Sequence, residues 1–430
     1  MIPVRLIAAM LILMMAAAPL PPIGAEEGGS PAAHPSPAAP LPASGGWAPL
    51  GTAPSPLNAP VRALAVAGAD LYVGGEFVNA GGVDGAAGIA RWDGQQWHSL
   101  GRGVSAPVFA LALHGTDVYV GGRFARAGDV RNANGIARWD GARWHALGGG
   151  LTGPVFTLAV AGSDLYVGGE FVNAGGSGGT RSVARWDGAR WHALGGGLNK
   201  PVCALAVAGS DLYVGGFFTD AGGRPDADYL ARWDGQQWHP VGGELNGPVF
   251  ALAADGADLA VGGDFTNADG DARIYLLRRT GAAFVSPGGA AAGALNHEVF
   301  ALAVAGADLY VGGRFTHAGG VRNANGIARW DGRQWHPVGG GLTGPVFALA
   351  VRGTEAYAGG NFFTAGGDPR ANFAAVARAG AGATQVYLPL ITREAPTPAR
   401  SARDAPWAAE RPASTTPAPP PAPRPPRPNP

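Results

Sequence analysis

The sequence predicts an all-β fold built from seven copies of one unit. A strand-like segment that ends in a glycine pair, with an aromatic residue close behind, recurs at intervals of 47 residues and once of 50. The pairs are Gly74-Gly75, Gly121-Gly122, Gly168-Gly169, Gly215-Gly216, Gly262-Gly263, Gly312-Gly313 and Gly359-Gly360. A period of about 40–50 residues is typical of propeller blades, small sheets that become stable by stacking on their neighbours. We therefore predict a seven-bladed β-propeller of four-stranded antiparallel blades.

The third copy illustrates the strands expected in each blade. Its apolar runs cover residues 155–160, 165–169, 182–186 and 191–194. Small and polar residues at 161–164 suit a tight turn, and Asp187-Gly188 is a strong hairpin signal. The runs are apolar on both faces, as expected of sheets sandwiched between other sheets. We expect alanines at the crowded centre of the ring, with Trp and Phe farther out, where the blades diverge.

The start of the repeat region predicts how the ring closes. Residues 45–51 copy a fourth strand but precede the first complete blade, and the seventh copy loses its Trp pair after Arg378. We expect this N-terminal strand to complete the last blade. The segment 386–390 competes for the same edge, so strands from both termini are an open alternative.

The two ends of the chain differ from the repeats in composition. Residues 1–25 combine Arg5, an apolar run and a small-residue cleavage site, as a secretory signal does. Residues 26–44 are a Pro/Ala/Ser linker, 45–392 the propeller and 393–430 a Pro-rich, disordered tail. Prolines interrupt the apolar run, so we expect no membrane span after cleavage. The tail is open to three interpretations: an envelope spacer, a glycosylated stalk or a simple terminus.

Charge and cysteine content exclude several classes of protein. The 31 basic and 31 acidic residues balance, so no nucleic acid is expected as a partner. A single cysteine, Cys203, excludes an internal disulfide framework although the chain is expected to be secreted or displayed at the cell surface. We expect a monomer.

The repeat resembles the kelch repeat and the repeats of the galactose oxidase central domain. The resemblance rests on the Leu-Tyr-Val-Gly-Gly strand end, the Ala-Arg-Trp-Asp-Gly turn and a second Trp five residues after the first, and it covers about residues 45–388. The Trp pairs are Trp92 and Trp97, Trp139 and Trp144, Trp186 and Trp191, Trp233 and Trp238, and Trp330 and Trp335. Arg-Trp stands where kelch repeats more often have Tyr. The resemblance implies a binding platform, since such propellers only occasionally carry enzymes.

The oxidase chemistry of that relative is not expected here. It would need a copper site with a Tyr cross-linked to a Cys, whereas Cys203 stands where most copies have Phe. The copies with Phe carry Phe109, Phe156, Phe250, Phe300 and Phe347.

Two further patterns are not expected to be sites. Five histidines follow the second Trp of a pair, each on the outer strand of a different blade: His98, His145, His192, His239 and His336. They are too far apart to bind one ion, so we expect them to cover Trp edges or to bond to a neighbouring blade. Residues 148–153 and 339–344 match a dinucleotide fingerprint, but Pro154 and Pro345 lead straight into another strand, so these are turns.

The candidate ligand face carries the loops between the second and third strands and the connections between blades. The residue just after each glycine pair varies in charge: Glu76, Arg123, Glu170, Phe217, Asp264, Arg314 and Asn361. The loops of the second and sixth copies add Arg131 and Arg322. These side chains form either the ligand-binding surface or simple salt bridges at the rim.

The fourth and fifth copies are acidic. Asp264, Asn267, Asp269 and Asp271 have the spacing of oxygen donors in a calcium loop, and Asp220, Asp226 and Asp228 precede them. Calcium is the one cofactor considered; the alternative is that these residues only form turns. The fifth copy is also degenerate, with Ala260, Arg279 and Phe284 at positions of Tyr, Trp and Trp, which indicates either a relaxed blade or a pocket.

These observations favour a secreted, non-catalytic binding platform for a protein or glycan. The alternatives are an exported carbohydrate-active hydrolase, lyase or oxidase with its site at the channel mouth, and a structural module of the cell envelope. No residue set matches a known catalytic site, so we expect no enzyme. The identity of the ligand stays open.

Overall fold

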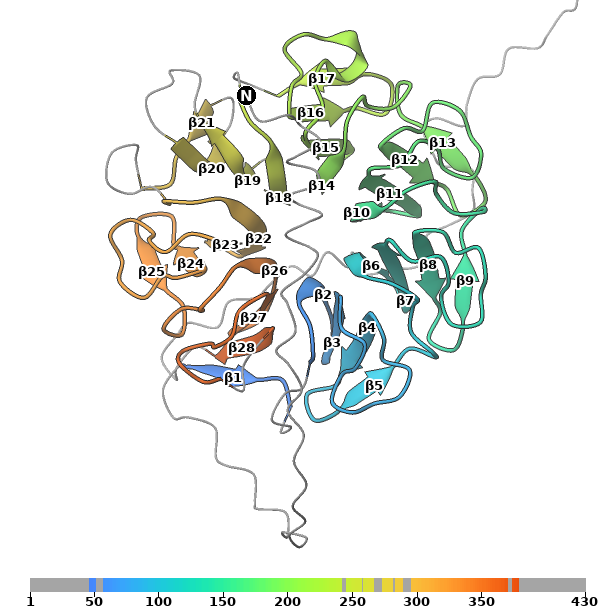
Figure 1. The fold of residues 1–430 in the computed structure, drawn as a ribbon. Coiled ribbons are helices and arrows are strands. Elements are labelled where there is room, and N and C mark those ends of the chain that lie inside the picture. Colours follow the sequence, from blue (N-terminus) through green and yellow to red (C-terminus); the bar gives the residue numbers. More distant parts are fainter. Residues whose placement is uncertain are drawn as a thin grey trace, which may run out of the picture. The chain divides into compact units, whose positions relative to one another are not determined.

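Seven four-stranded antiparallel sheets surround a central channel in the computed structural model of this protein (Figure 1), which confirms the predicted propeller. The structure describes residues 46–51, 57–241, 245–256, 258–266, 273–280, 283–288, 295–369 and 373–378. The expected signal, most of the linker and the Pro-rich tail lie outside these ranges. Within them, no helix has the length and apolar character needed to span a membrane.

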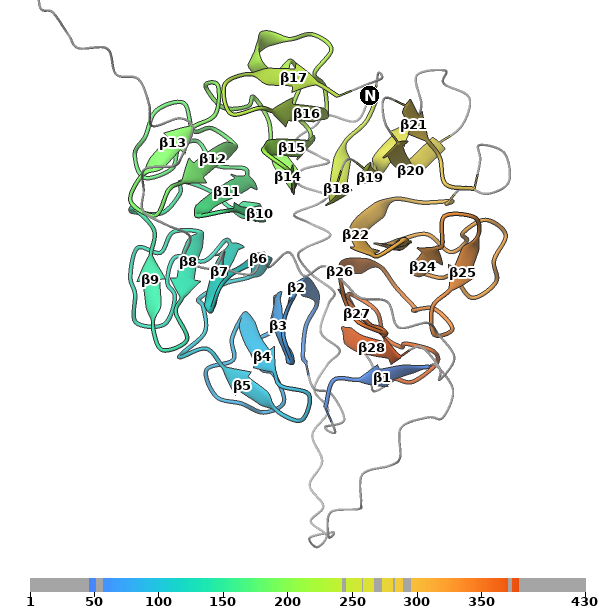
Figure 2. The ribbon, with the colours of Figure 1, turned by 180° about the vertical axis from the view of Figure 1, so that it is seen from behind.

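Each blade presents its first strand to the channel and its fourth to the outside, as both views of the ring show (Figures 1 and 2). The innermost strands are β2 (Val61–Ala67), β6 (Val108–His114), β10 (Val155–Ala161), β14 (Val202–Ala208), β18 (Val249–Asp255), β22 (Val299–Ala305) and β26 (Val346–Arg352). The second strands are β3 (Asp70–Gly75), β7 (Asp117–Gly122), β11 (Asp164–Gly169), β15 (Asp211–Gly216), β19 (Asp258–Thr266), β23 (Asp308–Gly313) and β27 (Glu355–Gly360).

The outer half of each blade consists of shorter strands in most copies. The third strands are β4 (Ile89–Trp92), β8 (Ile136–Trp139), β12 (Val183–Trp186), β16 (Leu230–Trp233), β20 (Arg273–Thr280), β24 (Ile327–Trp330) and β28 (Ala374–Arg378). The fourth strands are β5 (Trp97–Ser99), β9 (Trp144–Ala146), β13 (Trp191–Ala193), β17 (Trp238–Pro240), β21 (Ala283–Val285), β25 (Trp335–Pro337) and β1 (Trp47–Pro49). A 3₁₀ turn, η1 (Ala221–Gly223), lies between β15 and β16.

The N-terminal strand closes the ring, as predicted. β1 pairs antiparallel with β28, with Trp47 opposite Ala377. The indole Nε1 of Trp47 also donates a hydrogen bond of 3.1 Å to the carbonyl of Val338 in the sixth blade. The competing segment 386–390 lies outside the described residues.

The glycine pairs are required by the close approach of neighbouring blades. A Cβ on Gly121 would lie 2.5 Å from Cγ1 of Val155, the first residue of the next innermost strand, and the first glycine of every pair meets the equivalent valine. A Cβ on Gly122 would meet the carbonyl oxygen of Pro107. Any side chain here would push the blades apart, which explains why the pair is present in all seven copies.

The Trp pairs hold the outer parts of the blades together. Trp186 and Trp191 have ring centroids 5.1 Å apart and are both buried, as the sequence predicts. The Nε1 of Trp191 donates to the carbonyl of Leu147 in the preceding blade. Equivalent bonds join Trp97 to Leu50, Trp144 to Leu100 and Trp238 to Leu194.

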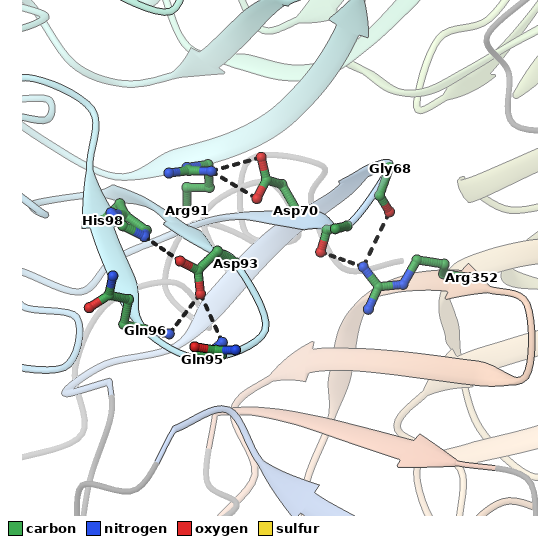
Figure 3. Close-up of polar contacts among 9 residues, drawn as sticks. Gly68, Asp70, Arg91, Asp93, Gln95, Gln96, His98 and Arg352 are labelled. Carbon is green, nitrogen blue, oxygen red and sulfur yellow. Dashed lines mark hydrogen bonds and ion pairs between the residues drawn. The ribbon is translucent and has the colours of Figure 1, made fainter.

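The five repeated histidines bond within their own hairpins and not to a neighbouring blade, which was one of the two roles expected for them. In the first blade the Nε2 of His98 lies 2.6 Å from Oδ2 of Asp93 within its own hairpin, rather than bonding to a neighbouring blade (Figure 3). The Oδ1 of Asp93 accepts hydrogen bonds from the backbone N–H groups of Gln95 and Gln96, which fixes the turn. The same arrangement recurs at His145, His192, His239 and His336. The reason is their spacing in the chain. The Asp and the His are five positions apart on the two sides of one tight hairpin, which brings their side chains together.

The fifth blade differs from the others without opening a ligand pocket in the described residues. Arg279 replaces a Trp and donates a hydrogen bond of 3.2 Å to the hydroxyl of Tyr213 in the fourth blade. Ala260, at the position of the usual Tyr, lines a void of about 10 Å³ next to the sixth blade. Such a void has room for roughly one water molecule.

Candidate functional site: the mouth of the central channel

The channel mouth on the loop-bearing face is the candidate site. The connections between blades pair with the loops after the second strands, through bridges such as Val104 with Ala127 and Leu151 with Ala174. The connections and these loops therefore share one face, as predicted. The innermost strands start from this face, so their first residues surround the channel mouth.

A β-bulge in every innermost strand sets which side chain enters the channel. In the second blade the register shifts between Val108 and Ala110, which leaves Phe109 as the extra residue. A bulge re-aims its extra residue, and all seven copies have one. The expectation that Phe lies in the outer part of the ring is therefore wrong for this position.

Five of these bulge residues are phenylalanines, which we call the collar: Phe109, Phe156, Phe250, Phe300 and Phe347. Neighbouring rings contact one another at centroid distances of 5.9 Å for Phe109 and Phe156, and 5.8 and 5.7 Å along Phe250, Phe300 and Phe347. The collar and the residues behind it line a cavity of about 200 Å³. Most of the collar is partly exposed, so aromatic surface is available to a ligand.

The collar is interrupted at the first blade by a cation. Arg62 occupies the bulge position and stacks on Phe347, with its guanidinium carbon 4.1 Å from the ring centroid. Its Nη2 forms an ion pair of 2.6 Å with Glu76. Burial lowers the pKa of Arg62, and the carboxylate of Glu76 opposes that change.

The second interruption is at the fourth blade. Cys203 occupies the bulge position, and Phe217 of the same blade packs on Phe250 with centroids 5.8 Å apart. Burial raises the pKa of the Cys203 thiol to about 12, and the nearby carboxylate of Glu170 adds to the rise. A raised pKa disfavours the thiolate, so Cys203 is a protonated thiol in the channel wall.

The residues that follow the glycine pairs lie beside the mouth, because each donates its backbone N–H to the residue just before an innermost strand. The backbone N–H groups of Glu76, Arg123 and Glu170 donate to the carbonyls of Pro60, Pro107 and Pro154 at the start of the innermost strands. Arg314 and Asn361 bond in the same way to Glu298 and Pro345, as do Phe217 and Asp264 to Pro201 and Pro248. Among the described residues, no ion pair joins Glu76, Arg123 and Glu170 across blades, so the proposed rim salt bridges do not form between them.

The two loop arginines come later in their loops than the residues that follow the glycine pairs. Arg131 and Arg322 are exposed, on the loops after β7 and β23. Neighbouring asparagines Asn132 and Asn323 have positive φ values of 66° and 62°, which marks these loops as tight turns.

A polar cluster beside the mouth was not expected from the sequence. In the sixth blade the usual proline before the innermost strand is replaced by Glu298, preceded by His297. Oε2 of Glu298 is in contact with Nδ1 of His297, and Oε1 of Glu298 lies 4.0 Å from Nη1 of Arg314. The His297 ring stacks on Tyr275 of the fifth blade at a centroid distance of 6.2 Å. The loss of this one proline, within the longer interval of 50 residues between glycine pairs, is the sequence signal that would have revealed the cluster.

The calcium prediction is only partly within the described structure. Asp264 lies in β19, whereas Asn267, Asp269 and Asp271 lie outside the described residues. In the fourth blade Asp228 accepts a hydrogen bond from the backbone N–H of Asp220, as a turn former does. No group of three or more potential metal ligands occurs in the described parts of the chain.

Comparisons with known proteins support the fold only. No protein-family model matches the chain, and no curated protein matches it. Among solved structures it is similar to the extracellular domain of BT4673 from B. thetaiotaomicron, with 12% identity over 77% of this chain and 40% of the other, at a TM-score of 0.50. It is also similar to the computationally designed protein Ika8 (18% identity, 77% and 99% covered, TM-score 0.44). A third is YCF48 from Cyanidioschyzon merolae (11% identity, 79% and 100% covered, TM-score 0.45).

Proposed function

We propose that this chain is an extracytoplasmic, non-catalytic binding propeller whose ligand, a protein or glycan, is held at the mouth of the central channel. The repeat is kelch-like in its glycine pairs and Trp spacing. The secretory character of residues 1–25 supports export, and the similar BT4673 structure is itself an extracellular domain.

The observation that carries this proposal is where the seven copies differ from one another. The buried Trp pairs, glycine pairs and hairpin aspartates recur because packing needs them in nearly every blade. The bulge residues and the residues after the glycine pairs differ in charge and size, and they meet at the mouth beside a cavity of about 200 Å³. Packing does not require this variety, whereas recognition of an asymmetric ligand does.

Panels of glycans and peptides applied to the immobilised full chain test the proposal. Phe300→Ala removes part of the collar and is expected to abolish binding of any ligand found. Gln95→Ala, in an exposed turn on the opposite face, is the matched control and is expected to retain it. Binding that survives Phe300→Ala but not Gln95→Ala would place the ligand on the wrong face for this proposal.

One observation favours a second function, an exported carbohydrate-active enzyme at the same mouth. The cluster of Tyr275, His297, Glu298 and Arg314 combines groups from two blades at one spot. A carboxylate on Nδ1 orients an imidazole so that Nε2 can accept a proton. Turnover of chromogenic glycosides that is lost in His297→Ala and Glu298→Gln supports this function; no turnover by the parent protein excludes it for those substrates.

A further inference from the structure

The first blade shows how the collar holds a positively charged group. The guanidinium of Arg62 lies over the collar ring of the preceding blade, Phe347, and is neutralised by Glu76 beside the mouth. A cation over an aromatic face is attracted by the ring quadrupole, more strongly where water is excluded. The side chain of Arg62 is only 6% exposed, so this is such a place.

The fourth blade has the same aromatic neighbour at this position without the cation, but Phe217 stands where the first blade has Glu76. Cys203 occupies the bulge position of Arg62, between the collar rings Phe156 and Phe250, and we call the space at its small side chain the notch. Phe156 is the collar ring of the preceding blade, as Phe347 is for Arg62. A carboxylate is supplied instead by the third blade: Glu170 lies beside the mouth, where its backbone N–H donates to the carbonyl of Pro154, and it contributes to the raised pKa of the Cys203 thiol. In the described structure this carboxylate is exposed and forms no ion pair.

A second departure from the repeat marks the same side of the cavity. Thr157 lines the cavity where the other six copies have alanine. No hydrogen bond of its hydroxyl is present among the described residues. The notch therefore combines an aromatic face and a hydroxyl acceptor, whereas the other side chains of the cavity wall are apolar. The Glu170 carboxylate lies beside the mouth, outside the cavity lining.

We propose that the notch binds a guanidinium group of the ligand, such as an arginine side chain, stacked on the collar ring of the preceding blade as Arg62 is in the first blade. The group would stack on Phe156, pair with Glu170 and donate to Thr157. Planar guanidinium suits this site because it stacks and forms hydrogen bonds at the same time. This inference rests on the proposed binding function and specifies the chemistry that the mouth recognises.

Calorimetric titration of the full chain with N-acetyl-L-arginine amide tests the proposal. The citrulline analogue, which has nearly the same shape and no charge, is the matched ligand control. We expect the arginine compound to bind and the citrulline compound to bind at least about tenfold more weakly, as loss of a cation–π contact and an ion pair implies. Equal binding of the two compounds, or no binding of either, would overturn the proposal.

Three variants locate the site. Glu170→Gln is expected to weaken arginine binding by about fivefold to tenfold. Cys203→Phe places the residue of five other copies in the notch and is expected to abolish binding. Asp129→Asn, a loop carboxylate paired only with the exposed Arg102, controls for net charge and is expected to bind like the parent.

The outcomes separate this inference from the proposed function. Unchanged binding in Glu170→Gln overturns the inference, even if Cys203→Phe fails to fold. A glycan or peptide ligand that depends on Phe300 but does not compete with the arginine compound leaves the binding platform in place and removes the guanidinium site.

Discussion

At the interfaces between blades, the presence or absence of a Cβ atom decides whether a residue fits the fold. At Gly121 a Cβ would overlap Val155, whereas at Gly178 a Cβ would meet nothing within 4 Å. Gly121 is therefore retained for packing and not for backbone freedom, since no positive φ is recorded for it.

Gly121→Ala is expected to destabilise the protein by about 1–3 kcal/mol, the range for overpacked cores. The matched control, Gly178→Ala, should change the free energy of unfolding by less than about 0.5 kcal/mol. Urea denaturation of both variants measures the difference. Equal midpoints for the two variants would contradict the packing explanation.

The hairpin aspartates make stability depend on pH. The His192 ring and two backbone N–H groups hold the pKa of Asp187 well below its ordinary value, and four other hairpins repeat this. A lowered carboxyl pKa contributes stability that is present above the unfolded-state pKa of about 3.9 and is lost as the pH falls toward the folded-state pKa.

We therefore expect the urea midpoint to fall steeply below about pH 4. Replacing all five aspartates by Asn keeps an acceptor for the backbone N–H groups but removes the charge, so the slope in this pH range should become shallower. The five are Asp93, Asp140, Asp187, Asp234 and Asp331. A parallel pH profile for the variant would show that other carboxylates cause the acid sensitivity.

At the scale of elements, one short strand joins the ends of the ring. β1 contributes three residues to the seventh blade, yet Trp47 is 4% exposed and packs between the sixth and seventh blades. The strand thus supplies the fourth strand of the seventh blade and joins the N-terminal end of the described ring to its C-terminal end.

Deleting residues 45–52 is expected to expose the edge of β28 and to cause early melting and aggregation, because an unpaired edge invites pairing with other chains. Light scattering during a thermal melt measures both effects. Trp47→Phe, which keeps the strand and loses the bond to Val338, should melt only slightly earlier than the parent. A truncated chain that stays monomeric with the parent's melting temperature would mean that another segment closes the ring.

At the scale of the whole molecule, charge is unevenly distributed around the ring. The fourth and fifth copies are consecutive in the chain and both carry acidic loops. Carboxylates that lie close together repel one another unless a cation lies among them. The residues that decide this, 267–271, lie outside the described structure, so calcium binding stays a prediction.

Calcium is expected to raise the melting temperature measurably, because a ligand that binds the folded state stabilises it. Asp269→Asn combined with Asp271→Asn should remove most of the gain, while Asp129→Asn should not. Differential scanning calorimetry with calcium and with a chelator tests this. No shift in the parent protein would leave these residues as turn formers.

The sequence alone determined the number of blades and their strand order, and it favoured the N-terminal strand for closing the ring over the open alternative at 386–390. The glycine pairs recur in all seven copies, and the Trp spacing and the Asp-Gly turns in five. Such local signals can be recognised in the sequence because they are repeated. Even Trp47 could be assigned, because residues 45–51 copy a strand that is seen elsewhere in the chain.

Only the tertiary structure decided which residues face a ligand. Whether Phe109 enters the channel depends on a one-residue bulge in the pairing of β6 with β7, and a shift of one residue moves a side chain to the other face. The contacts of Arg62 with Phe347, and of Tyr275 with His297, join different blades. Such contacts form only when the blades pack against one another in the ring. A local sequence pattern therefore cannot predict them.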